Sequence, residues 1–161
     1  MPDTDLETPF AEVRTRHLFD LALQVPPPQT PGGPAGMERR IGLIDGGAFR
    51  GERLSGAVLP GGDDWQTVRS DGAVLLDARI VLRTGDDALI GMIYSGIRHG
   101  PQEVMARLAR GEAVDPASYY FRITASFTTS DPRYDWLNRI LAIGSGHRFA
   151  AGPRYSVYEV A

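Results

Sequence analysis

Apolar and polar residues alternate along most of the chain with the period of two that is typical of β-strands. The first such segment spans residues 10–25, where Phe19, Leu21 and Leu23 are the apolar positions. Further strands are predicted at residues 37–43, 49–59, 65–69, 73–84, 88–98, 119–128, 137–144 and 155–160. Short turns separate these segments, so the pattern predicts a mostly β fold, an antiparallel and closed or nearly closed barrel of about eight to ten strands.

Two segments depart from this strand pattern. Residues 101–112 begin with Pro101 and carry apolar residues at helical spacing, at Val104, Met105 and Leu108. Gly111 is a suitable C-terminal stop, so this segment is predicted to be the single main α-helix. Asp131 precedes a proline, and we expect it to cap a short helical turn that runs through Trp136.

Residues 26–36 contain five prolines and three glycines and are predicted to be an irregular loop. The chain has 161 residues, a length typical of one domain. We therefore expect residues 1–161 to form a single β-barrel domain, with this proline- and glycine-rich loop at its surface.

The clearest strand pair is formed by residues 73–84 and 88–98. If Gly85-Asp86 is a two-residue hairpin turn, Arg79 lies opposite Met92, and Asp77 lies opposite Tyr94. The first strand, at residues 73–84, has one apolar face and one mixed face, which indicates that both faces are partly buried. On this ground we expect a homo-oligomer.

The composition excludes several classes of function. The net charge is -3 without a basic stripe, so no nucleic-acid partner is expected. The chain has no cysteine, and its three histidines, His17, His99 and His147, have no metal-binding spacing. No phosphate or dinucleotide loop is present, so no metal and no cofactor are expected. Without a signal peptide or a membrane-spanning apolar run, the expected location is the cytoplasm.

Two groups of motifs resemble a known family. The first comprises Gly61-Gly62-Asp63-Asp64-Trp65 and Leu76-Asp77-Ala78-Arg79, and the second comprises Tyr120-Phe121-Arg122, Tyr134-Asp135-Trp136-Leu137-Asn138 and residues 155–160. Together they resemble the uncharacterised bacterial and fungal family catalogued as domain of unknown function 3237, from about Phe10 onward. The resemblance implies a β-barrel, more loosely similar to allene oxide cyclase and the dirigent proteins. It brings no established catalytic residues, and shape alone does not confer function.

Asp77, Arg79 and Tyr94 are the first candidates for a catalytic site. With Met92 beside them, a carboxylate, a guanidinium and a phenol among apolar neighbours would have the composition of a ligand pocket. Arg79 would bind an anionic oxygen, Asp77 would orient the ligand or act as a base, and Tyr94 would donate a hydrogen bond. The alternative is an ion pair between Asp77 and Arg79 on a solvated face.

Further candidates for ligand binding come from the family motifs, at Asp64, Trp65, Arg122, Trp136 and Asn138. Asp64 and Trp65 are expected at a barrel mouth, although a turn residue beside a core tryptophan is the alternative. Arg122 would add a second inward cation, or else cover apolar surface with its stem. Trp136 and Asn138 would cap the barrel end, where Asn138 has the alternative role of a backbone cap.

The sequence thus favours a barrel that binds a small, partly apolar, oxygenated molecule. Enclosed barrels exclude water and hold a substrate in one conformation, which suits a cofactor-free isomerase, cyclase or lyase. A non-catalytic carrier or sensor would use the same pocket. An oligomeric interaction module, with its barrel filled by side chains, is the third possibility.

Overall fold

Antiparallel strands make up most of residues 11–161, the part of the chain that the computed structural model describes. The first predicted segment starts at Phe10, which lies outside the described residues. In chain order the strands are β1 (Thr15–Gln24), β2 (Gln29–Gly32), β3 (Met37–Leu43), β4 (Gly46–Arg50), β5 (Ser55–Val58), β6 (Asp63–Arg69), β7 (Val74–Thr84), β8 (Leu89–His99), β9 (Tyr120–Thr128), β10 (Ala142–Phe149) and β11 (Gly152–Val160). The helical segments are α1 (Gln102–Ala109) and the 3-10 helices η1 (Pro116–Ser118) and η2 (Pro132–Arg139).

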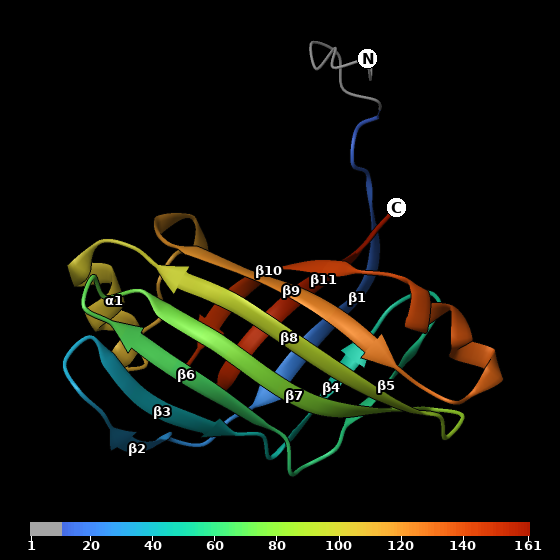
Figure 1. The fold of residues 1–161 in the computed structure, drawn as a ribbon, viewed down its shortest axis with the longest axis horizontal. Helices are drawn as coiled ribbons and strands as arrows, with labels where there is room; N and C mark the ends of the chain where they lie inside the picture. The colour runs from blue at the N-terminus through green and yellow to red at the C-terminus, as the bar shows by residue number, and fades with distance from the viewer. Residues whose placement is uncertain (1–10) are drawn as a thin grey trace, which may run out of the picture.

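The sheet closes on itself into an antiparallel barrel, as the turn pattern predicts. Around the barrel the order is β7-β5-β4-β1-β11-β10-β9-β8, and β8 pairs with β7 to complete the ring (Figure 1). β6 pairs with β7 beyond the end of β5, and β3 and β2 follow β6 outward. The predicted fold class is confirmed. None of the helices in residues 11–161 is long and apolar enough to cross a membrane.

Alternate residues of each strand point into the barrel and form the core. On β7 the inward positions are all apolar, at Val74, Leu76, Ala78, Ile80 and Leu82. The rings of Phe49 and Phe127 contact Phe19 edge-on, with centroid distances of 5.5 and 6.1 Å. Leu137 of η2 is fully buried and belongs to the same hydrophobic core as these rings.

The two ends of the barrel are closed by different helices, as Figure 1 shows. α1 follows β8 and buries Val104 and Leu108, so the predicted apolar stripe is confirmed. Gly111 adopts a φ of 75° and its N–H donates to the Leu108 carbonyl, which ends the helix as expected. At the other end, Asp131 accepts a hydrogen bond from the Arg133 N–H and caps η2, also as expected.

The hairpin between β7 and β8 has a different register from the predicted one. Its loop has three residues, because Thr84 pairs with Ala88, and Asp87 adopts a left-handed φ of 69°. A three-residue loop that ends in a left-handed residue is a common hairpin geometry. Tyr94 therefore lies opposite Ala78, and the predicted pairing of Tyr94 with Asp77 is wrong by one residue.

Three other predicted segments differ in detail from the structure. The single strand predicted at 49–59 is interrupted at residues 51–54, and its two parts belong to the antiparallel pair β4 and β5. Within residues 26–36, the short edge strand β2 pairs with β3, so this stretch is not wholly irregular. Pro31 lies within β2, which is compatible with an edge strand because proline cannot donate to a ladder. The predicted strand at 137–144 is also displaced: Leu137 belongs to η2, and β10 begins at Ala142.

Candidate functional site

A cavity of about 360 Å³ lies in the end of the barrel that α1 covers. We call it the α1 chamber. Its apolar wall includes Met105 and Leu108 of α1, and Pro26 and Pro28 lie at its edge. Its polar wall consists of inward side chains from β3, β6, β8 and β10, namely Arg40, Gln66, Arg98 and Arg148. A bound molecule would thus meet both apolar surface and cations.

A smaller hollow of about 30 Å³ lies deeper in the barrel and shares five lining residues with the α1 chamber. We call it the inner recess. Asp64, Tyr94 and Tyr155 line it, together with Arg98 and Arg148. A water molecule occupies about 30 Å³ in the liquid, so the recess has room for one water or one small functional group. A molecule in the α1 chamber could therefore extend a carbonyl or hydroxyl group toward Asp64.

Asp64 is the buried acid of this site, with 5% of its surface exposed. One carboxylate oxygen accepts a hydrogen bond from Gln66 Nε2 at 2.8 Å, and the other accepts from the Asp77 backbone N–H at 2.9 Å. Burial raises the pKa of Asp64, and the two hydrogen bonds together with the charge of Arg98 offset only part of that effect. A carboxyl group with a raised pKa holds its proton more readily than a solvated one, which suits it to proton transfer.

Two buried phenols stand beside this carboxyl group. The rings of Tyr94 and Tyr155 meet edge-on with a centroid distance of 5.4 Å. Burial and the nearby charge of Asp64 raise the pKa of both tyrosines, so both hydroxyls stay protonated at neutral pH. Among residues 11–161, the Tyr155 hydroxyl has no hydrogen-bond partner. It is thus available as a donor to a group in the inner recess.

Three arginines line the polar wall, and we call Arg40, Arg98 and Arg148 the arginine cradle. Burial and the neighbouring cations lower the pKa of Arg98 to about 10, and burial also lowers the pKa of Arg40 and of Arg148. Within residues 11–161, no carboxylate lies within ion-pair distance of any cradle guanidinium. The site is therefore strongly cationic.

The described residues contain no group of three His, Cys, Asp or Glu side chains that could hold a metal ion. In the α1 chamber and the inner recess, Asp64 is the one acidic side chain. Guanidinium and phenol groups are donors, so this set of residues favours an anionic or carbonyl-bearing organic ligand.

Asp77 and Arg79 lie on the outside of the barrel, which corrects the predicted convergence with Tyr94. Their side chains are 56% and 64% exposed and form an ion pair at 3.6 Å. The reason is the apolar alternation of β7: its core face takes Leu76 and Ala78, so the charged positions between them face outward. The solvated ion pair, which the sequence left open as the alternative, is the observed arrangement. Asp77 still contributes to the site through its backbone N–H.

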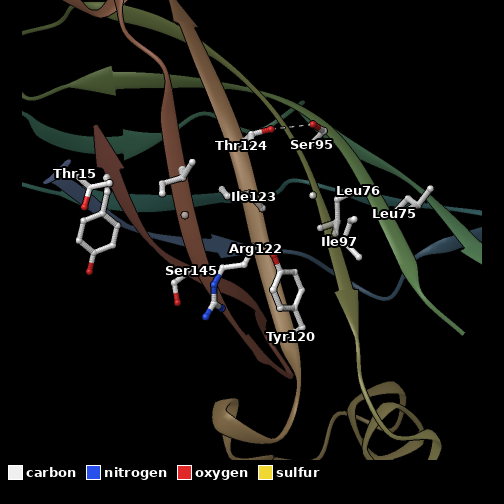
Figure 2. Close-up of a pocket in the computed structure, with 14 residues that line it drawn as sticks. Thr15, Leu75, Leu76, Ser95, Ile97, Tyr120, Arg122, Ile123, Thr124 and Ser145 are labelled. Carbon is white, nitrogen blue, oxygen red and sulfur yellow. Dashed lines mark hydrogen bonds between the residues drawn. The ribbon is translucent and has the colours of Figure 1, made fainter. Parts of the chain in front are cut away.

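Trp65 and Arg122 also face outward, whereas Met92 points into the core. Trp65 is 46% exposed, so it forms no wall beside Asp64. Arg122 donates to the Phe121 carbonyl at 2.9 Å and lies over the ring of Tyr120. Figure 2 shows Arg122 in a groove on the outer face, together with Thr124 and Ser95, which share a hydrogen bond of 3.3 Å. The predicted inward position of Arg122 is wrong.

Trp136 and Asn138 lie at the η2 end of the barrel, far along the strands from Asp64. Trp136 packs partly against the core and lies 4.4 Å beneath the guanidinium of Arg53. Asn138 exchanges hydrogen bonds with the backbone of Thr129, at 2.8 and 2.9 Å, which is the backbone-cap alternative. Trp136 thus packs at the apolar end, Asn138 is exposed there, and neither residue lines the α1 chamber.

Sequence reasoning missed five residues that line this site: Arg40, Gln66, Arg98, Arg148 and Tyr155. Residue parity could have found Arg98, because it lies on the same face of its strand as Met92 and Tyr94. Gln66 likewise shares a face with Asp64 on β6. No local signal brings Arg40 and Arg148 to the same chamber, since that requires the closure of the barrel.

The fold and the site define a closed antiparallel β-barrel with a cationic chamber at one end. A family model described as "Protein of unknown function (DUF3237)" matches residues 13–160, and the chain belongs to that family. The family resemblance drawn from the sequence motifs is thus confirmed.

Individual relatives share this fold. The chain is 37% identical over 153 residues to "UPF0311 protein RPA1785" of Rhodopseudomonas palustris (strain ATCC BAA-98 / CGA009), covering 95% of this chain and 99% of that one. The crystal structure of RPA1785 matches with a TM-score of 0.90 at 36% identity, covering 94% and 99% of the two chains. A β-barrel like protein from Acinetobacter baumannii AYE matches with a TM-score of 0.82 at 38% identity, covering 94% and 98%. An enzyme from Penicillium herquei shares the fold, with a TM-score of 0.73 at 21% identity over 97% and 100% of the chains.

The groove of Figure 2 has a volume of about 780 Å³ and runs over the outer face between β7 and β11. Around it the apolar side chains of Ile93, Ile97, Tyr120 and Ile143 are 40–47% exposed. Its lining contains no buried ionisable side chain, in contrast to the α1 chamber and the inner recess. The expected homo-oligomer stays a prediction.

Proposed function

We propose that this protein binds a small, partly apolar, oxygenated molecule in the α1 chamber and moves a proton on it without a cofactor. The observation that carries the proposal is the buried carboxyl group of Asp64, whose pKa is raised, beside two buried phenols. Pairs of ionisable groups with shifted pKa values in an enclosed pocket are typical of acid–base sites. The shared fold of a Penicillium herquei protein described as an enzyme is compatible with catalysis.

In this proposal Asp64 takes a proton from a carbon next to a carbonyl group of the ligand. The electron pair of the broken C–H bond moves onto the carbonyl oxygen, which becomes an enolate. Tyr155, which has no other hydrogen-bond partner among the described residues, donates to that oxygen, and Arg98 supplies positive charge. If a C=C bond is conjugated to the enolate, the negative charge also reaches its far carbon, and Asp64 returns the proton there, which gives an isomerase. Expulsion of a leaving group from the enolate gives a lyase.

A deuterium-exchange measurement tests the role of Asp64. The probe is 2-oxo-4-phenylbutanoate in D₂O, and proton NMR follows the loss of its C3 hydrogens. We expect the wild-type protein to accelerate the exchange above the buffer rate. Asp64→Asn should reduce this acceleration by at least about 100-fold, because general bases typically contribute factors of this order.

Asp77→Asn is the matched control, since it removes a neighbouring acid that lies on the outer face. Its backbone N–H, which supports Asp64, is unchanged by the substitution. Exchange should therefore persist at the wild-type rate. If Asp64→Asn exchanges as fast as wild type, Asp64 is not the base. If Asp77→Asn alone abolishes exchange, the chemistry belongs to the outer face.

A non-catalytic carrier is the second candidate, and one observation favours it. Both oxygens of Asp64 already accept hydrogen bonds from the protein, as the oxygens of a structural carboxylate do. A carrier would bind the probe in the α1 chamber and leave its hydrogens in place. The open volume of that chamber argues against the third candidate, an interaction module with a filled barrel.

A further inference from the structure

The side chain of Arg98 is the most unusual group in the interior. It is only 6% exposed, and among residues 11–161 its Nε has no hydrogen-bond partner. Its guanidinium lies 5.2 Å from the ring centroid of Phe121 and lines both the α1 chamber and the inner recess. A buried charge without a partner is costly to maintain, and proteins normally pair such a charge or use it for binding.

The neighbours of Arg98 deepen the imbalance of charge. Arg40 and Arg148 add two more cations to the same walls, against the single carboxylate of Asp64. Arg40 donates its Nε to Gln66 Oε1 at 3.0 Å, and Arg148 donates to the Phe149 carbonyl. Both of these acceptors are neutral, so among residues 11–161 the carboxylate of Asp64 is the one negative charge that offsets the arginine cradle.

Most of the remaining lining of the α1 chamber is apolar. Met105 and Leu108 of α1 and Val68 and Val74 of the strands contribute apolar surface. A ligand that satisfies both walls must be amphipathic, with an anionic head and an apolar body. At about 360 Å³, the chamber falls within the range of small-molecule sites, which is roughly 300–1,000 Å³.

We infer that the ligand of the α1 chamber is an organic oxyanion, whose carboxylate or phosphate group sits on the arginine cradle and whose apolar body lies under α1. This inference deepens the proposed function and rests on its choice of chamber. It assigns Arg98 as the central binding residue, because a guanidinium offers two parallel N–H donors to a carboxylate or phosphate. Asp64 then faces the part of the ligand that enters the inner recess.

Calorimetric titration with simple aromatic probes tests this inference on the wild-type protein. Benzoate and phenyl phosphate carry an oxyanion, and benzamide has nearly the same shape without the charge. We expect benzoate to bind at least about 10-fold more tightly than benzamide, as charge-assisted hydrogen bonds imply. A preference for phenyl phosphate over benzoate would identify the head group as phosphate, and the reverse order would identify it as carboxylate. Equal affinity for benzoate and benzamide, or no binding of either oxyanion, would overturn the inference.

Arg98→Met and Arg122→Met form the matched pair of variants. Arg98→Met should lower the affinity for the oxyanion that the wild-type protein prefers by at least about 10-fold. Arg122→Met removes an exposed arginine of the outer groove and should leave the affinity unchanged. Loss of binding in Arg122→Met but not in Arg98→Met would contradict the assignment.

The titrations and the deuterium-exchange measurement fail separately. Oxyanion binding without exchange would refute proton transfer and keep the binding assignment. Exchange without a preference for the charged probes would refute the oxyanion assignment and keep proton transfer.

Discussion

The two ends of the barrel interior use the same alternation of side chains but are filled in different ways. At the η2 end, Phe19, Phe49 and Phe127 pack edge-on, and Leu137 closes the core. At the α1 end, the inward positions hold Asp64, Tyr94, Tyr155 and the arginine cradle around open space. One end is a packed core and the other is a polar chamber with unpaired charge.

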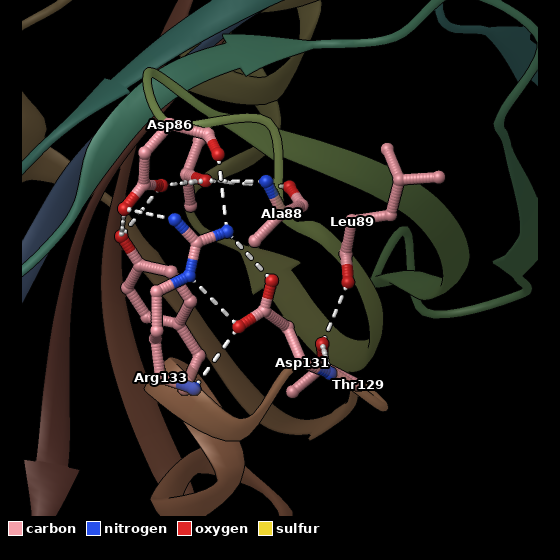
Figure 3. A network of polar contacts seen from close by, with 8 residues as sticks. Asp86, Ala88, Leu89, Thr129, Asp131 and Arg133 are labelled. Carbon is pink, nitrogen blue, oxygen red and sulfur yellow. Dashed lines mark hydrogen bonds and ion pairs between the residues drawn. The ribbon is translucent and has the colours of Figure 1, made fainter.

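The same contrast appears in how each end is closed. Figure 3 shows Arg133 of η2 in ion pairs with Asp86 of the β7–β8 loop at 3.0 Å and with Asp131 at 2.7 Å. The Tyr134 hydroxyl also donates to Asp86, at 2.9 Å. The charges that close the η2 end are thus paired, whereas the arginine cradle beneath α1 has no ion-pair partner among residues 11–161. Buried polar groups that reduce stability are typical of functional sites, because activity needs them.

The largest effect on stability is expected at the η2 end. Phe127→Ala removes a buried ring from the aromatic cluster and leaves a cavity. The free energy of unfolding should fall by about 3–5 kcal/mol, as is usual for a buried phenylalanine. Urea denaturation measures the change, and a fall of less than about 1 kcal/mol would show that this end is not a tightly packed core.

At the α1 end, Arg98→Met should have the opposite effect. The substitution replaces a buried, unpaired cation with an apolar side chain of similar length. We expect the free energy of unfolding to stay the same or rise by about 1–3 kcal/mol, because desolvation of the charge is relieved. The same urea series tests this. A clear loss of stability would mean that the guanidinium has a protein partner that holds the fold together.

The carboxyl group of Asp64 should make stability depend on pH. Its pKa is raised in the folded protein, so the folded state retains a proton that the unfolded chain releases above the ordinary value of 3.8. The wild-type advantage over Asp64→Asn should therefore be greatest below 3.8 and shrink as the pH rises through the folded pKa. Urea midpoints of both proteins across that range measure it. A wild-type advantage that grows with pH would instead indicate a stabilising, ionised Asp64.

The smallest change in stability is expected for Tyr155→Phe. The hydroxyl has no hydrogen-bond partner among the described residues, so its removal leaves no other group unpaired. The free energy of unfolding should change by less than about 1 kcal/mol. Deuterium exchange of 2-oxo-4-phenylbutanoate should nevertheless slow, because the enolate loses a donor. If thermal or urea unfolding shows a large loss instead, the hydroxyl has a structural role.

Local patterns predicted the fold well because closure of a barrel follows from many short antiparallel strands. Helix α1, with its stop at Gly111, and the cap at Asp131 were likewise visible from single residues. The site was harder to predict, because one residue of hairpin register decides which face of β7 meets Tyr94. Asp87 takes a left-handed conformation without being a glycine, so the three-residue loop gave little signal. The arginine cradle depends on strands that meet only when the barrel closes.

Binding of an oxyanion in the α1 chamber is tested by a crystal structure with bound 4-bromobenzoate, because anomalous scattering from bromine locates the ring. We expect the ring in the α1 chamber, against Met105 and Leu108, with its carboxylate within hydrogen-bond distance of the Arg98 guanidinium. A probe found only in the outer groove beside Arg122, with the chamber unoccupied at saturating concentration, would contradict it.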